Sequence, residues 1–108
     1  MRNKDTIVME AQLQVLANDM LEWKLEKGLR ECGKAINLLL LVKTALKDLE
    51  KEDIPLLVNA LEDAQQYIES EIFLKDVDPD QLDVRQVVTL KTLDEIIKKL
   101  KRIGGANE

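Results

Sequence analysis

The chain contains no histidine, one cysteine and one serine among its 108 residues. Without histidine it lacks the commonest general base and the commonest ligand of transition metals. The single Cys32 cannot form a conventional zinc site, and Ser70 has no histidine to activate it as a nucleophile. We therefore predict that the protein is not an enzyme, and that it has no catalytic residue, no metal site and no cofactor.

Glycine, proline and aromatic residues are also scarce. There are four Gly and two Pro, and aromatic residues make up 3% of a chain that is 45% hydrophobic and 34% charged. The glycines have no spacing that could form a phosphate-binding loop, because they occur only at positions 28, 33, 104 and 105. Few turn formers together with many Leu, Lys and Glu are typical of an all-helical protein.

Long hydrophobic runs are absent as well. The apolar run at residues 38–42 is far shorter than the about 20 residues that cross a membrane. The N-terminus has no long apolar stretch behind basic residues, so no signal peptide is predicted. A lone cysteine, expected to be a buried thiol, suits a reducing compartment. We expect a cytoplasmic protein that does not associate with membranes.

Helical periodicity dominates what is present. One series of residues alternates steps of four and three, as in a long helix that packs on other helices: Leu21, Leu25, Gly28, Cys32, Ala35, Leu39, Val42, Leu46 and Leu49. Similar patterns and their breaks predict helices near 5–27, 28–50, 54–74 and 84–103, with a loop at 75–83 and a disordered tail at 104–108. The predicted fold is all-α: a single domain over 1–108, forming an antiparallel three- or four-helix bundle with a long or broken first helix.

The first helix carries a second apolar stripe, formed by Met9, Leu13, Leu16, Met20 and Trp23. At about 100° per residue, this stripe points nearly opposite to the one formed by Leu25, Leu29, Cys32 and Ile36. One straight helix cannot direct both stripes at the same core. Either the helix breaks near Gly28 or Gly33 and its first part folds back, or the helix is continuous and its first stripe faces a second chain.

The same five residues are the predicted partner-binding residues, since Met and Trp are common at adaptable interfaces. Two alternatives stay open at this point. The stripe could be ordinary core of a fourth bundle helix, or core that is completed by a second copy of the chain.

The charge is unevenly distributed over a chain whose net charge is −5. Residues 50–83 contain eleven acidic and only two basic side chains, whereas residues 84–108 contain six basic and three acidic ones. Adjacent helices could simply attract each other across the bundle surface. Alternatively, the acidic segment could orient a basic partner.

The sequence evidence for two other kinds of site, a calcium site and a nucleic-acid-binding site, is weaker than that for the apolar stripe. Asp76, Asp78 and Asp80 alternate as calcium ligands do, but Gln81 replaces the required glycine and Val87 the bidentate carboxylate, so no calcium site is predicted. An alternative function, in nucleic-acid-associated regulation, is suggested by a basic cluster near the C-terminus: Lys98, Lys99, Lys101 and Arg102. This cluster has no aromatic side chains beside it on which bases could stack.

The function that the sequence favours is therefore a small protein-interaction module, acting as an adaptor, inhibitor or regulator. It would bind a protein partner or a second copy of itself, as a homodimer, through the apolar face of the first helix. The acidic central segment would orient the partner and increase the association rate.

Overall fold

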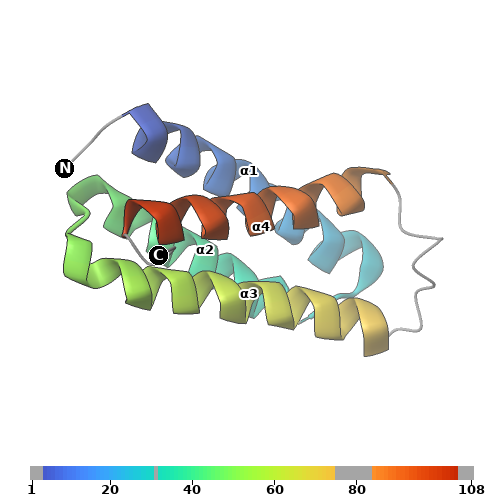
Figure 1. Cartoon of the computed structure of the whole chain (residues 1–108). Helices are drawn as coiled ribbons and strands as arrows, with labels where there is room; N and C mark the ends of the chain where they lie inside the picture. Colours follow the sequence, from blue (N-terminus) through green and yellow to red (C-terminus); the bar gives the residue numbers. More distant parts are fainter. Residues whose placement is uncertain (1–3, 31, 75–83, 105–108) are drawn as a thin grey trace.

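The computed structural model describes residues 4–30, 32–74 and 84–104 (Figure 1). It contains four α-helices: α1 (Lys4–Lys27), α2 (Cys32–Ala45), α3 (Ile54–Leu74) and α4 (Val84–Ile103). Two short 3₁₀ helices, η1 (Leu46–Asp48) and η2 (Lys51–Asp53), connect α2 to α3. The predicted all-α bundle is confirmed, in its four-helix form. The predicted loop at 75–83 and most of the predicted tail, residues 105–108, lie outside the described residues.

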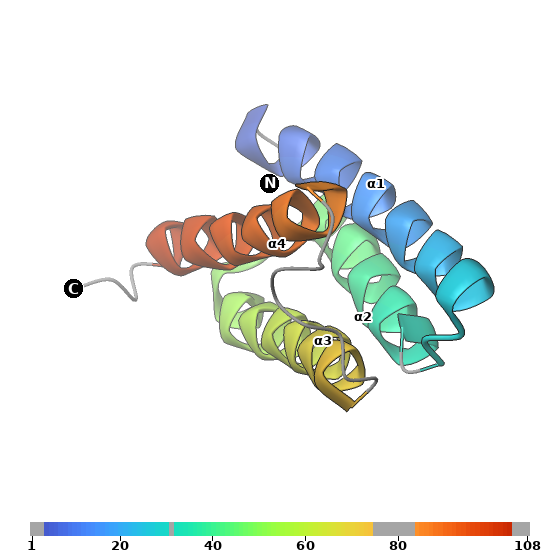
Figure 2. The ribbon, with the colours of Figure 1, turned by 90° about the vertical axis from the view of Figure 1, so that its right-hand side faces the viewer.

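The helices alternate in direction along the bundle, and the molecule measures 40 × 26 × 20 Å (Figures 1 and 2). α1 packs against α2, α2 against α3, and α3 against α4. α1 lies obliquely to α4, so these two helices meet over a shorter length than the other neighbours do (Figures 1 and 2). None of the helices in the described ranges is both long and apolar enough to cross a membrane.

Gly28 is the residue at which the first long helical pattern breaks. Its φ of 66° lies in the left-handed region that glycine adopts readily, and it directly follows the last residue of α1. A Cβ atom at this position would meet nothing within 4 Å, so the backbone angle alone demands glycine. Gly33 lies inside α2. Of the two alternatives for the first helix, the break with a folded-back helix is the one that the structure contains.

The break corrects part of the predicted packing face. The helix predicted over 28–50 begins at Cys32, and its α-helical part ends at Ala45. Leu21 and Leu25 were assigned to the same face as Cys32, but they are 47% and 74% exposed. The four-three pattern continues across a turn that reorients the chain, and therefore it does not mark one continuous face. From Cys32 onwards the assignment is right, since all later members are buried: Cys32, Ala35, Leu39, Val42, Leu46 and Leu49.

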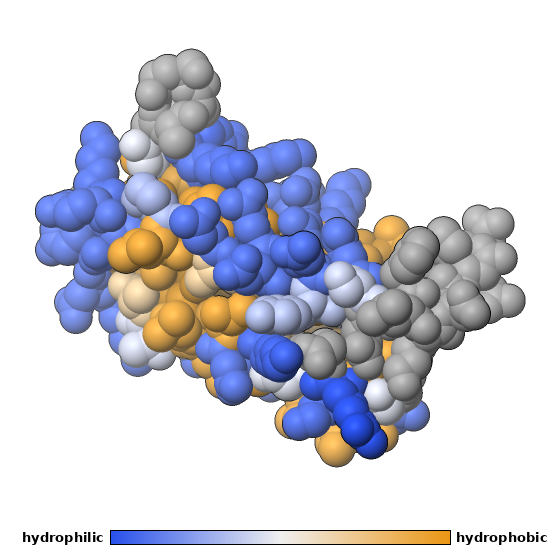
Figure 3. Space-filling model, turned by 90° about the horizontal axis from the view of Figure 1, so that it is seen from below, coloured by the Kyte–Doolittle hydropathy of each residue, from blue (hydrophilic) through white to orange (hydrophobic). Residues whose placement is uncertain are grey.

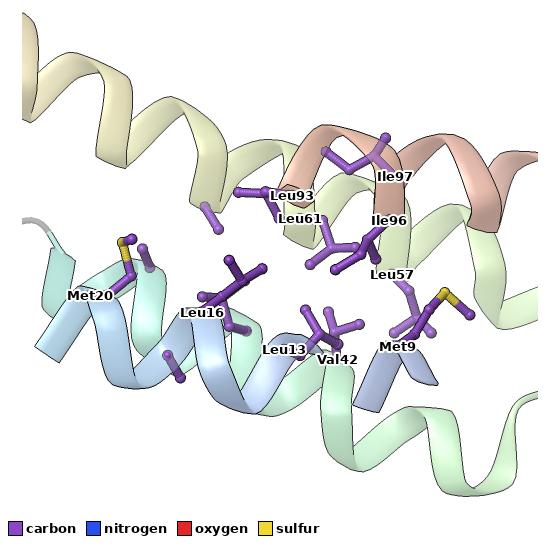
Figure 4. Packing of buried hydrophobic residues seen from close by; sticks show 14 of the residues in the cluster. Met9, Leu13, Leu16, Met20, Val42, Leu57, Leu61, Leu93, Ile96 and Ile97 are labelled. Carbon is purple, nitrogen blue, oxygen red and sulfur yellow. The ribbon is translucent and has the colours of Figure 1, made fainter. Parts of the chain in front are cut away.

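The core is one cluster to which all four helices contribute. Figure 4 shows side chains of α1 pointing towards Val42 of α2, Leu61 of α3 and Ile96 of α4. Aliphatic and thioether side chains fill this space, with Trp23 as its only aromatic member within the described ranges. Burial of this apolar area is what stabilises four helices that would be marginal on their own.

Candidate functional site: the apolar face of α2 and α3

The stripe on α1 forms part of the core. All five of its residues are at most 3% exposed: Met9, Leu13, Leu16, Met20 and Trp23. Because α1 folds back at Gly28, the stripe packs on α2, α3 and α4 of its own chain (Figure 4). A partner could reach these side chains only if the bundle opened. This burial removes the basis for the predicted partner-binding role, and the alternative of ordinary core describes their position.

A different apolar surface lies over α2 and α3. The ammonium nitrogen of Lys34 in α2 lies 5.4 Å from the centre of the Tyr67 ring in α3. The two helices are antiparallel, so equal steps forward along α2 and backward along α3 stay level. Leu41 lies seven residues, or two helical turns, after Lys34, and Ala60 lies seven residues before Tyr67, so Leu41 comes level with Ala60. Eleven residues on, Ala45 comes level with Leu56.

We call this stripe the α2/α3 face, because it contains the two most exposed large hydrophobic side chains among the described residues of the two helices. Leu41 and Leu56 are 59% and 67% exposed. Viewed from the α3 side, Figure 3 shows apolar surface gathered at the end of the bundle where α3 begins. The face comprises Leu38, Leu41, Ala45, Leu56, Ala60 and Tyr67. Contiguous exposed apolar surface with a polar rim is typical of an interaction site.

Opposite charges lie on the two helices that form this face. α2 contains two lysines and no acidic residue, whereas α3 contains four carboxylates and no lysine or arginine. Lys34 borders the face, while the Lys43 ammonium on the other side of α2 donates a hydrogen bond of 2.6 Å to Gln14 Oε1. Asp63 is exposed and lies between Ala60 and Tyr67 along α3. The face therefore has a positive edge on α2 and a negative edge on α3.

The basic cluster of α4 is paired in part with carboxylates of the same chain. Lys98 Nζ lies 2.9 Å from Asp94 Oδ2, and the hydrogen bond from this ammonium holds the pKa of Asp94 below its ordinary value. Lys101 Nζ lies 3.7 Å from Glu62 Oε2 on α3, which is an attraction between neighbouring helices of the kind that the charge distribution suggested.

The four basic residues of α4 lie on the side of the helix away from the core. At about 100° per residue they fall within an arc of about 160°, opposite the buried residues of the helix: Lys98, Lys99, Lys101 and Arg102. Lys99 and Lys101 are half-buried, and Lys98 and Arg102 are exposed. The nucleic-acid-associated function of this cluster stays a prediction.

A polar pair between α1 and α4 was not found by sequence reasoning. The Thr89 hydroxyl donates a hydrogen bond of 3.1 Å to Asp19 Oδ2, and both residues are buried. Asp19 immediately precedes Met20 of the buried stripe, and this position next to the stripe was the available signal. Within the described residues, no three His, Cys, Asp or Glu side chains come together in a way that could hold a metal ion.

No protein-family model, curated protein or solved structure matches this chain. The interpretation of the α2/α3 face therefore rests on its geometry and chemistry.

Proposed function

We propose that this protein is a non-enzymatic interaction module, acting as an adaptor, inhibitor or regulator, that associates through the α2/α3 face. The observation that carries the proposal is the exposure of Leu41 on α2 and of Leu56 on α3, about one helical turn apart along the same face. The proposal keeps the acidic central segment of the sequence prediction but moves the apolar contact from α1 to α2 and α3.

The partner that this face fits is a second copy of the chain, which gives a homodimer. A two-fold axis parallel to the helices places α2 of each copy opposite α3 of the other. Lys34 then comes level with Tyr67 of the second copy, and Asp63 of that copy lies one turn away. Lys34 of each copy thus lies near Asp63 of the other copy, so the two-fold axis forms this contact between opposite charges twice. Such charge complementarity favours the correct register of the two copies and fast association.

The apolar centre of the face supplies the affinity. Fully burying a leucine side chain contributes about 1.5–3 kcal/mol, and the two-fold axis buries Leu41 and Leu56 from both copies. These are also the residues that leave the most apolar surface in water on the face. A cytoplasmic location belongs to the same proposal, because Cys32 is the only cysteine of the sequence and its side chain is buried.

Light scattering on the purified chain tests this function. We expect the wild type to have twice the mass of one chain, and the double variant Leu41→Asp with Leu56→Asp to have the mass of one chain. Circular dichroism should show that this variant keeps its helices, because both positions are exposed. Leu25→Asp is the matched control: Leu25 is the more exposed leucine, lies on α1 and should leave the dimer intact. A monomeric wild type, or dissociation by the control as well, would refute the proposal.

Charge reversal tests the orientation of the two copies. Lys34→Glu and Asp63→Lys should each weaken the dimer, because each places like charges opposite one another. The combined variant should recover affinity, since the attraction is restored with its signs exchanged. Additive losses in the combined variant would show that the two edges do not face each other.

A further inference from the structure

The first turn of α3 and the last turn of α4 lie at the same end of the bundle (Figure 1). A cavity of about 290 Å³ lies between them, with η2 at its edge. This volume is close to the lower end of the range of about 300–1,000 Å³ that is usual for small-molecule sites. The cavity is separate from the α2/α3 face, because none of the described residues that line it belongs to α2.

The floor of this cavity is apolar. The side chains of Ile54 and Val58 are 3% and 7% exposed and line it from α3, together with the ring of Pro55. Gly104 lines it from the end of α4. A Cβ atom at Gly104 would lie 2.9 Å from Cγ2 of Ile54, so a larger residue would fit only if the floor moved. Glycine therefore allows the end of α4 to approach α3 closely, and this approach forms one end of the cavity.

The charged side chains that line the cavity leave one ammonium group unpaired. Lys101 Nζ lies 3.7 Å from Glu62 Oε2, so these two opposite charges offset each other. Lys51 in η2 is exposed and forms no ion pair with any residue of the described ranges. Glu52 and Asp53 follow it in η2, but neither of them lines the cavity. The lining thus carries one positive charge in excess, beside an apolar floor.

We propose that this cavity binds a small aliphatic monocarboxylate. One carboxylate group balances the excess charge at Lys51, whereas a second carboxylate on the ligand would approach Glu62. The hydrocarbon chain covers Pro55 and Val58 and removes apolar surface from water. The ammonium of Lys51 donates a charge-assisted hydrogen bond to the carboxylate, and because this lysine is exposed the bond adds a modest share of the affinity.

Three probes separate the two parts of such a ligand. Hexanoate has both the charge and the chain, hexanol has only the chain, and acetate has only the charge. Each is titrated into the full chain at constant pH, while the backbone amide signals are followed by two-dimensional NMR. We expect hexanoate to bind more tightly than either of the other two, and the shifted signals should belong to residues around Lys51, Asn59 and Gly104.

Variants assign the charge and the floor. Lys51→Gln removes the unpaired charge but keeps a polar side chain. It should weaken hexanoate binding about two- to fivefold, the range for a pair of exposed charges, and leave hexanol binding unchanged. Lys47→Gln is the matched control, because Lys47 is an exposed lysine of η1 that does not line the cavity. Gly104→Ala should weaken hexanoate and hexanol alike, since its methyl group displaces the floor at Ile54.

Several outcomes would overturn the proposal. These are an absence of shifts with all three probes, an affinity for hexanoate no higher than for hexanol or acetate, or equal losses in Lys51→Gln and Lys47→Gln, which would show a general effect of net charge. If Gly104→Ala does not fold, Lys51→Gln decides, because position 51 is exposed. The variant Leu41→Asp changes the α2/α3 face and should bind hexanoate as the wild type does, so this proposal is tested independently of the dimer.

Discussion

Two apolar surfaces of similar character have opposite fates in this molecule. The stripe on α1 that includes Leu13 is buried by the three other helices, whereas the α2/α3 face that includes Leu41 stays exposed. Both surfaces are formed by leucine and other apolar residues at helical spacing. Burial of the α1 stripe stabilises the folded chain, whereas the apolar area of the α2/α3 face can be buried only against another molecule. Apolar periodicity thus identifies surfaces that pack, but it does not say whether they pack within the chain or outside it.

Truncating Leu13 and Leu41 to alanine should give the largest difference in the free energy of unfolding. Leu13→Ala removes a fully buried side chain and should lower the free energy of unfolding by about 2–5 kcal/mol. Leu41→Ala should change the free energy of unfolding of the monomer by less than about 0.5 kcal/mol, because the side chain is exposed. Urea denaturation measures both effects, with Leu41→Ala compared in a Leu56→Asp background that light scattering has first shown to be monomeric. Similar losses at the two positions would show that the α2/α3 face is covered within the chain.

The turn that directs the α1 stripe inwards should give an intermediate effect. Gly28→Ala forces a side chain into the left-handed region and should destabilise the fold by about 1–2 kcal/mol. Gly33→Ala is the matched control, since Gly33 is helical and alanine is the better helix former. Its Cβ would lie 3.3 Å from the flexible end of Lys24, which can move away. A shift in the urea midpoint for Gly28→Ala no larger than that for Gly33→Ala would contradict the assignment of the turn.

The exposed ion pair on α4 should give the smallest effect. Lys98→Ala removes the ammonium that lowers the pKa of Asp94, so this pKa should rise towards its ordinary value. A carboxyl whose pKa is lower in the folded chain stabilises it above the ordinary pKa of about 4, and this stabilisation is lost as the pH falls through the folded value. The stability difference between wild type and Lys98→Ala should therefore be present at neutral pH and vanish in acid. NMR titration of the Asp94 carboxyl checks the pKa directly, and an unchanged value would exclude the ion pair in solution.

Much of the helical fold was readable because local signals agreed. A helix was predicted near 54–74, where Pro55 is tolerated within the first turn, and the structure begins α3 at Ile54. α4 likewise begins at Val84, as the sequence predicted. The error at Leu21 and Leu25 arose because the spacing stayed regular across Gly28 while the chain direction did not. Periodicity reports the angle around a helix axis, and it loses its meaning where the axis changes.

The candidate sites were harder to predict for a related reason. Leu41 lies within the apolar run at residues 38–42, which does not by itself distinguish a buried side from an exposed one. Nothing in the sequence shows that α1 and α4 leave one side of α2 uncovered. Asp19 and Thr89 are seventy positions apart in the chain, and neither pattern nor spacing links them. Contacts between distant residues depend on how helices cross, which is a property of the assembled core.

The sequence by itself determined that this protein is helical, where most of its helices lie and that its central segment is acidic, because periodicity, capping and charge are local properties of the chain. Only the tertiary structure decided which apolar stripe became core and which stayed exposed. Four helices have a limited interior, and once α1 folds back at Gly28 to fill it, the outer side of α2 and α3 has no helix left to cover it.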